Sequence, residues 1–91
     1  MAGVRKKLNF RGRVQGVGFR YYAYHCASYC RLTGWVRNLD DGRVELEIQG
    51  DKDMAGLFLA KIKEGSRFIR VDHMDIHEIS EQKESSFCIR G

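Results

Sequence analysis

Apolar residues in the first third of the chain follow two different periods. Between residues 8 and 14 they alternate with charged and polar residues, a spacing that predicts a strand with one buried face. From Phe19 the period lengthens to three or four residues, which predicts a helix that ends near Leu32, with Gly34 just past its end. The apolar positions of this strand and helix are Leu8, Phe10, Val14, Phe19, Ala23, Cys26, Ala27 and Cys30.

Two strands joined by a tight turn are predicted next. Residues 35–38 favour a second strand, and residues 44–48 alternate between apolar and charged side chains as a third strand does. Residues 40–42 read Asp-Asp-Gly, which is typical of a hairpin turn because glycine supplies the positive φ that closes it. Gly50 is expected to end the third strand.

A second helix and further β-structure complete the pattern. Asp51 is a favourable cap for a helix whose apolar residues repeat as far as Gly65. Residues 68–79 favour β-structure, but their alternation slips between residues 71 and 74, which indicates a bulge or a late strand start. Residues 87–89 predict a short last strand. The order βαββαβ plus a short fifth strand predicts an α+β protein, a ferredoxin-like α/β sandwich with two helices on one face of an antiparallel sheet.

Length and composition narrow the class of protein. The 91 residues are expected to form a single domain, residues 1–91, and no large self-complementary apolar patch is evident, which favours a monomer. A net charge of +4 favours anionic ligands. Three cysteines fit neither a disulfide framework nor a zinc pattern, so a reducing, cytoplasmic location is expected. The charged residues 5–7 near the start of the chain precede no apolar segment of the kind that signal peptides contain.

The segment between the first strand and the first helix carries the candidate chemistry. Residues 12–20 read Gly-Arg-Val-Gln-Gly-Val-Gly-Phe-Arg, and no Ser, Thr, Asp or Asn caps the helix that begins at Phe19. Backbone N–H groups of a tight glycine loop and of an uncapped helix start bind anions. The guanidinium of Arg20 matches phosphate oxygens in pairs. The segment therefore predicts a phosphate pocket, although it matches neither the P-loop pattern nor the dinucleotide fingerprint, which would need Gly or Ala at Tyr21.

The same segment resembles the phosphate-binding signature of the acylphosphatase family at nearly every position. A second stretch, residues 34–44 followed by Gly50, resembles that family's second signature with the same spacing, and residues 87–90 resemble its C-terminal strand. Residues 65–67 read Gly-Ser-Arg where the family usually has Gly-Pro, which leaves the start of the fourth strand open.

The resemblance implies hydrolysis of the carboxyl–phosphate bond of small acyl phosphates, with no metal or other cofactor. It implies that Arg20 binds the phosphate and that Asn38 orients the attacking water. It also implies that the backbone of the loop supplies further hydrogen-bond donors. The residues of that loop are Gln15, Gly16, Val17, Gly18, Phe19 and Arg20.

Other functions are compatible with the predicted fold. One is a phosphate- or anion-binding module without turnover, including a regulatory domain of a larger carbamoyl-phosphate-using protein. Another is an RNA-binding module, but Glu45 and Glu47 would lie on the open face of the third strand and repel a phosphate backbone. His73, Asp75 and His77 alternate along a strand, and a solvated sheet face is preferred over a metal site there. The sequence therefore favours the enzyme, with neither nucleic acid nor membrane as partner.

Overall fold

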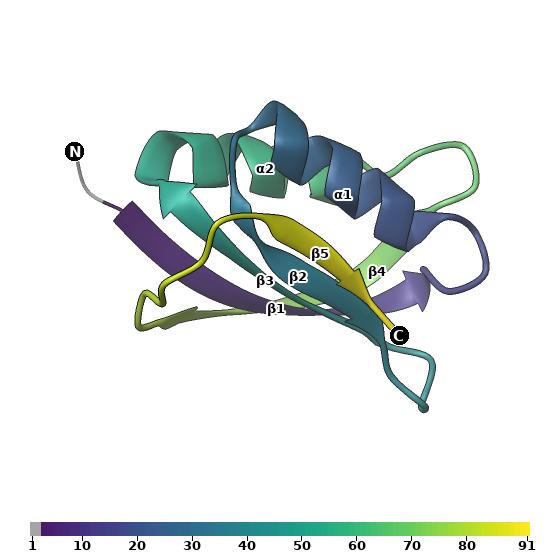
Figure 1. Cartoon of the computed structure of the whole chain (residues 1–91). Helices are drawn as coiled ribbons and strands as arrows, with labels where there is room; N and C mark the ends of the chain where they lie inside the picture. The colour runs from purple at the N-terminus through teal and green to yellow at the C-terminus, as the bar shows by residue number, and fades with distance from the viewer. Residues whose placement is uncertain (1–2) are drawn as a thin grey trace.

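The protein is described by a computed structural model that covers residues 3–91 (Figure 1). Residues 1 and 2, at the charged start of the predicted domain, lie outside the described residues. Two helices and five strands follow one another in the predicted order. Their bounds are β1 (Gly3–Arg13), α1 (Phe19–Tyr29), β2 (Thr33–Asn38), β3 (Val44–Asp51), α2 (Lys52–Glu64), β4 (Arg70–Ile79) and β5 (Phe87–Arg90).

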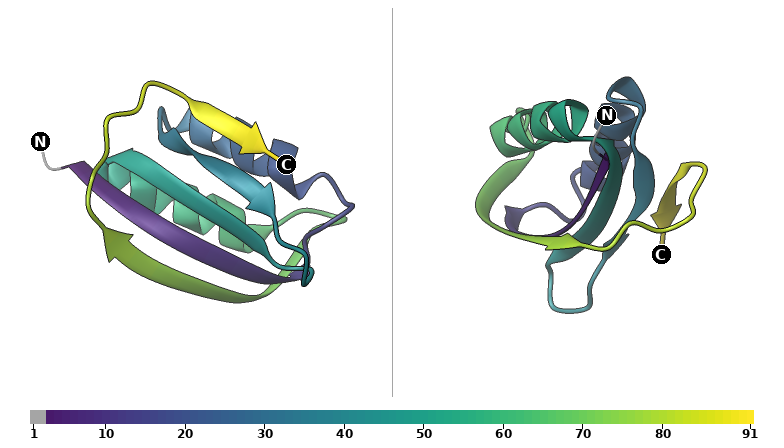
Figure 2. Two further views of the ribbon diagram at one scale, coloured as in Figure 1. Left: turned by 60° about the horizontal axis from the view of Figure 1, so that its bottom comes forward. Right: turned by 90° about the vertical axis from the view of Figure 1, so that its left-hand side faces the viewer.

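The strands form one sheet in the order β4-β1-β3-β2-β5, and both helices cover the same face of it (Figure 2). This arrangement confirms the predicted ferredoxin-like α+β fold. One detail of the prediction is wrong: β5 pairs with β2 in the parallel direction, whereas the other neighbours are antiparallel. The sheet is therefore mixed, because the chain leaves β4 at one edge and crosses to the opposite edge before β5 begins (Figure 2).

The core lies between the sheet and the two helices. Every apolar position predicted for the first strand and helix is buried, and the rings of Phe10 and Phe19 are 5.0 Å apart at an angle of 58°. Burial of one such side chain stabilises a fold by about 1.5–3 kcal/mol. This aromatic pair packs β1 against the first residue of α1.

The end of α1 differs from the prediction. The helix ends at Tyr29, and Arg31 adopts a left-handed backbone with φ of 56°. This conformation brings the backbone N–H of Leu32 to 2.9 Å from the carbonyl oxygen of Ala27, and it lets Leu32 enter the core. Gly34 therefore lies inside β2 rather than just past the helix, because the chain has already reversed at Arg31.

β1 and β3 extend beyond the residues that their periodicity predicts. β1 begins at Gly3, and β3 continues through Gly50 to Asp51, because residues 3–10 of β1 pair with the whole of β3, with Gly3 opposite Asp51. The expectation that Gly50 ends β3 is therefore wrong. On β1 the apolar alternation is interrupted at Lys6, which lies on the same face of the strand as Val4 and Leu8.

The predicted cap, helix stop and bulge are confirmed. Asp51 accepts hydrogen bonds from the backbone N–H groups of Asp53 and Met54, at 3.0 and 3.2 Å, and Gly65 ends α2 with φ of 70°. On β4, Val71 lies opposite Gly12 while His73 lies opposite Arg11, so Asp72 is the extra residue of a bulge. The bulge accounts for the slipped alternation in this strand.

The open face of the sheet is covered by charged side chains and by residues 80–86, which join β4 to β5. Arg5 on β1 donates hydrogen bonds of 2.8 Å to Glu47 on β3 and to Glu84 in the connecting segment. Burial raises the pKa of Glu84, but the hydrogen bonds from Arg5 outweigh it and hold this pKa below its ordinary value. Arg5 therefore ties the connecting segment to the sheet.

Among residues 3–91, neither helix combines the length and the apolar composition that a membrane crossing needs.

Candidate active site

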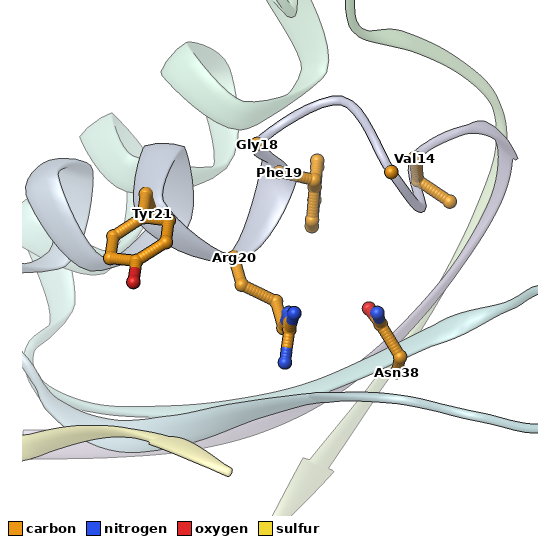
Figure 3. Close-up of a pocket in the computed structure, with 7 residues that line it drawn as sticks. Val14, Gly18, Phe19, Arg20, Tyr21 and Asn38 are labelled. Carbon is orange, nitrogen blue, oxygen red and sulfur yellow. The ribbon is translucent and has the colours of Figure 1, made fainter. Parts of the chain in front are cut away.

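A pocket of about 160 Å³ lies between the loop that joins β1 to α1 and the end of β2 (Figure 3). Residues far apart in the sequence meet there, because α1 packs across the strand that follows it. The pocket is lined by Val14, Gly16, Gly18, Phe19, Arg20, Tyr21 and Asn38. Both stretches that carry the family resemblance therefore contribute to one pocket.

The loop beside this pocket contains two glycines and leads into an uncapped helix. Gly16 and Gly18 have φ of 72° and 81°, left-handed conformations that favour glycine, and a Cβ atom at either position would meet no atom within 4 Å. Gly18 is the N-cap of α1, and no side chain caps the helix. The first helical hydrogen bond runs from Tyr22 N–H to Gly18 C=O at 3.0 Å. The preceding N–H groups therefore form the kind of helix start that binds anions.

Two polar side chains extend toward each other across the pocket. Arg20, on the first turn of α1, and Asn38, the last residue of β2, face one another in Figure 3. Arg20 Nη1 donates a hydrogen bond to the carbonyl oxygen of Gly91. The Oδ1 atom of Asn38 is buried and has no hydrogen-bond partner among residues 3–91. The Asn38 side chain thus brings to the edge of the pocket an amide, a group that can both accept and donate hydrogen bonds.

Gln15 contributes through its side chain, which the sequence did not indicate. Its Nε2 atom donates hydrogen bonds of 2.7 Å to the carbonyl oxygen of Leu39 and 2.9 Å to that of Arg43. Leu39 N–H also bonds to the Arg43 oxygen, at 2.8 Å. The Gln15 amide thus joins the loop between β1 and α1 to the base of the β2–β3 hairpin, directly after Asn38.

The turn of that hairpin is stabilised by its own acidic residue. Asp41 accepts hydrogen bonds from the backbone N–H of Arg43 at 3.1 Å and from its Nε at 2.7 Å. The backbone bond is the main reason that the pKa of Asp41 lies below its ordinary value. Asp41 is therefore a turn-forming residue, as the hairpin pattern predicted.

The family model described as Acylphosphatase matches residues 6–89, which include the pocket. The chain belongs to the acylphosphatase family. It is an enzyme that hydrolyses acyl phosphates, small-molecule substrates, as the resemblance implied.

Individual relatives agree with this assignment. The chain is 54% identical over 65 residues to an acylphosphatase of Geobacillus kaustophilus, an alignment that covers 71% of this chain and 69% of the relative. The crystal structure of an acylphosphatase from Bacillus subtilis superposes with a TM-score of 0.93 at 37% identity, covering 97% of this chain and 99% of that one. The fold also matches part of full-length HypF, with a TM-score of 0.89 at 26% identity; 99% of this chain corresponds to 12% of that protein.

The other residues singled out in the sequence lie outside the acylphosphatase pocket. His73 and Asp75 form an exposed pair at 2.9 Å on the edge strand β4, and within residues 3–91 no three potential metal ligands converge. The Tyr22 hydroxyl donates to the carbonyl oxygens of Lys61 and Gly65, at 2.7 and 3.0 Å, so this ring joins α1 to the end of α2.

Trp35 lies on the open face of the sheet, where the guanidinium of Arg37 is 5.3 Å from its ring centre.

Glu45 and Glu47 do lie on the open face of β3, as predicted, but their charges are paired. Glu45 lies 2.6 Å from Arg37 and 3.3 Å from Lys7, and Glu47 lies 2.7 Å from Arg5. Although burial raises the pKa of Glu45, hydrogen bonds from Arg37 and Lys7 hold it below its ordinary value. The expected repulsion of a phosphate backbone is therefore weaker than the sequence suggested, because neighbouring cations neutralise these carboxylates.

Proposed function

We propose that Arg20 and the backbone N–H groups of residues 15–20 hold the phosphoryl group of an acyl phosphate, while Asn38 orients the water that attacks it. The observation that carries this proposal is the convergence of Arg20, Asn38 and the two loop glycines on one pocket. Phosphoryl transfer depends chiefly on positioning and on stabilising the charge of the equatorial oxygens, which this set of donors suits.

The proposed reaction is a single displacement at phosphorus. Water attacks phosphorus, the bond from phosphorus to the carboxylate oxygen breaks, and the carboxylate leaves with that electron pair. One proton of the water passes to an oxygen of the phosphate itself, so the products are a carboxylate and dihydrogen phosphate. The amide of Asn38 suits the water because it accepts and donates hydrogen bonds without adding negative charge beside the dianion.

The test compares the hydrolysis of benzoyl phosphate by the wild-type protein and by Asn38→Ala, with a chelator present. We expect rapid turnover by the wild type and a loss of about 10²- to 10³-fold in kcat for Asn38→Ala, the effect of misplacing one reacting group. Asn9→Ala is the matched control, because Asn9 on β1 also has a buried Oδ1 without a partner in residues 3–91 but lies outside the pocket.

The outcomes separate the parts of the proposal. Turnover that requires a metal would overturn the metal-independent mechanism, and full activity of Asn38→Ala would remove Asn38 from it. If inorganic phosphate raises the melting temperature but no substrate is hydrolysed, the pocket binds anions without turnover.

A further inference from the structure

Of the three residues with large apolar side chains that border the pocket, only one is exposed. Val14 and Phe19 line the pocket, but each is only 1% exposed because both belong to the core. Tyr21, on the first turn of α1, also lines the pocket and is 65% exposed. A large exposed aromatic ring beside a polar pocket is a surface on which an apolar group can be buried.

The position of Tyr21 relative to Asn38 indicates which part of the substrate would lie near the ring. In Figure 3, Tyr21 and Asn38 lie on opposite sides of the Arg20 side chain. In a displacement at phosphorus, the attacking and leaving oxygens are roughly in line, on opposite sides of the phosphorus atom. A phosphoryl group held by Arg20, with its water beside Asn38, therefore directs its leaving carboxylate, and the acyl group attached to it, toward Tyr21.

The neighbouring tyrosines on α1 have other contacts. The Tyr22 hydroxyl is bonded to Lys61 and Gly65, and the Tyr24 ring packs near Phe87 with centroids 6.3 Å apart. These contacts tie both rings to other parts of the fold. Tyr21 alone of the three lines the pocket.

We propose that Tyr21 is a specificity-determining residue whose ring packs against the acyl group, so that acyl phosphates with aromatic or bulky apolar acyl groups bind better than those with small ones. The proposal rests on the proposed function of Arg20 and Asn38. Tyr21 takes no part in the chemical step, and its effect belongs to substrate binding.

The experiment measures kcat and KM for benzoyl phosphate and acetyl phosphate with wild type, Tyr21→Ala and Tyr21→Phe. We expect Tyr21→Ala to raise KM for benzoyl phosphate about 3- to 10-fold, the range typical of one aromatic contact, with kcat nearly unchanged. The KM for acetyl phosphate and the inhibition constant of inorganic phosphate should change less than about twofold, because neither carries a large apolar group. Tyr21→Phe keeps the ring and should behave as wild type.

Tyr29→Ala is the matched control, since Tyr29 lies on the same helix and is 68% exposed but does not line the pocket. Equal effects of Tyr21→Ala on both substrates, or no effect on either, would overturn the role of Tyr21 while leaving the hydrolytic function intact. A wild-type protein that hydrolyses neither substrate would instead overturn the proposed function, and this inference with it.

Discussion

The side-chain amide of Gln15 donates a hydrogen bond of 2.7 Å to the carbonyl oxygen of Leu39, the residue that directly follows Asn38. Through this bond, the loop that would bind the phosphate holds the strand end that would bind the water. A second bond from the same amide to Arg43 closes the base of the hairpin. The spacing between the two functional groups of the pocket therefore depends on a residue that need not touch the substrate with its side chain.

Replacing Gln15 with methionine should slow catalysis more than it weakens phosphate binding. The change removes two hydrogen bonds, each contributing about 1 kcal/mol, but keeps the length of the side chain. We expect kcat for benzoyl phosphate to fall about tenfold, because a small displacement of Asn38 misplaces the water, while the inhibition constant of phosphate changes less than about twofold. Gln49→Met, which removes side-chain hydrogen bonds on the open face, is the control. Equal losses in both quantities would contradict this positioning role.

Arg20→Lys should lose most of its activity although the charge is kept. An ammonium group cannot present two parallel N–H donors to two phosphate oxygens, so kcat/KM should fall about 10²- to 10³-fold and inorganic phosphate should inhibit more weakly. Arg70→Lys, on the edge strand β4 where Arg70 pairs with Asp72 in solvent, should be neutral. Near wild-type turnover of Arg20→Lys would show that the guanidinium is dispensable.

Asn38→Asp should be worse than Asn38→Ala for phosphate binding. A carboxylate at this position keeps the shape of the side chain but repels the phosphate dianion, whereas alanine only removes the amide. Steady-state kinetics with phosphate as competitive inhibitor measure the difference, and circular dichroism checks that both variants are folded. If phosphate inhibits Asn38→Asp as strongly as wild type, Asn38 does not lie beside the phosphoryl group.

Most of the fold follows from local patterns in the sequence. The spacing of the apolar residues predicts which faces of β1 and α1 are buried in the core. Asp51 and Gly65 mark the two ends of α2. These signals are local because a cap or a helix stop acts on residues within one turn. The loop between β1 and α1 is local in the same sense, since a glycine-rich segment enters an uncapped helix directly.

The features that the sequence did not reveal depend on distant partners. Arg5 looks like a surface residue until Glu47 and Glu84, from two other segments, surround it. The left-handed backbone of Arg31 could not be predicted from its residue type, because glycine or asparagine usually occupies that conformation. The Gln15 side chain is informative only once the β2–β3 hairpin lies beside it.

Acid should destabilise the protein partly through Glu84. Its pKa is lower in the folded protein than the ordinary value of 4.5, so this carboxylate stabilises the fold above about pH 4.5, and the contribution is lost as the pH falls through the folded pKa. We expect Glu84→Gln to reduce the free energy of unfolding by about 1–2 kcal/mol near pH 7, and the difference from wild type to shrink as the pH falls below 4.5, as measured by urea unfolding.

The control for this measurement is Glu78→Gln, whose partner Lys6 lies 3.8 Å away at the surface, and whose effect should stay within about 0.5 kcal/mol. An undiminished effect of Glu84→Gln near pH 3 would contradict the role assigned to the Glu84 charge.

One thiol should react rapidly in the native protein. Cys88 on β5 is exposed, whereas Cys26 and Cys30 are buried, and burial is the main reason that the pKa of each of these two thiols is raised. A chromogenic disulfide reagent should therefore titrate one equivalent quickly and the remaining two only after unfolding in urea. Fast reaction of a second thiol under native conditions would show that α1 opens readily.

Gly91 contacts Arg20 beside the pocket, whereas Gly3 begins β1 at the end of the strand far from the loop that leads into α1 (Figure 1). A purification tag or fusion partner attached after Gly91 would start next to Arg20, and one attached ahead of Gly3 would start a strand's length away. The two tagged forms of this acylphosphatase should therefore not be treated as interchangeable in kinetic work or in crystallisation trials.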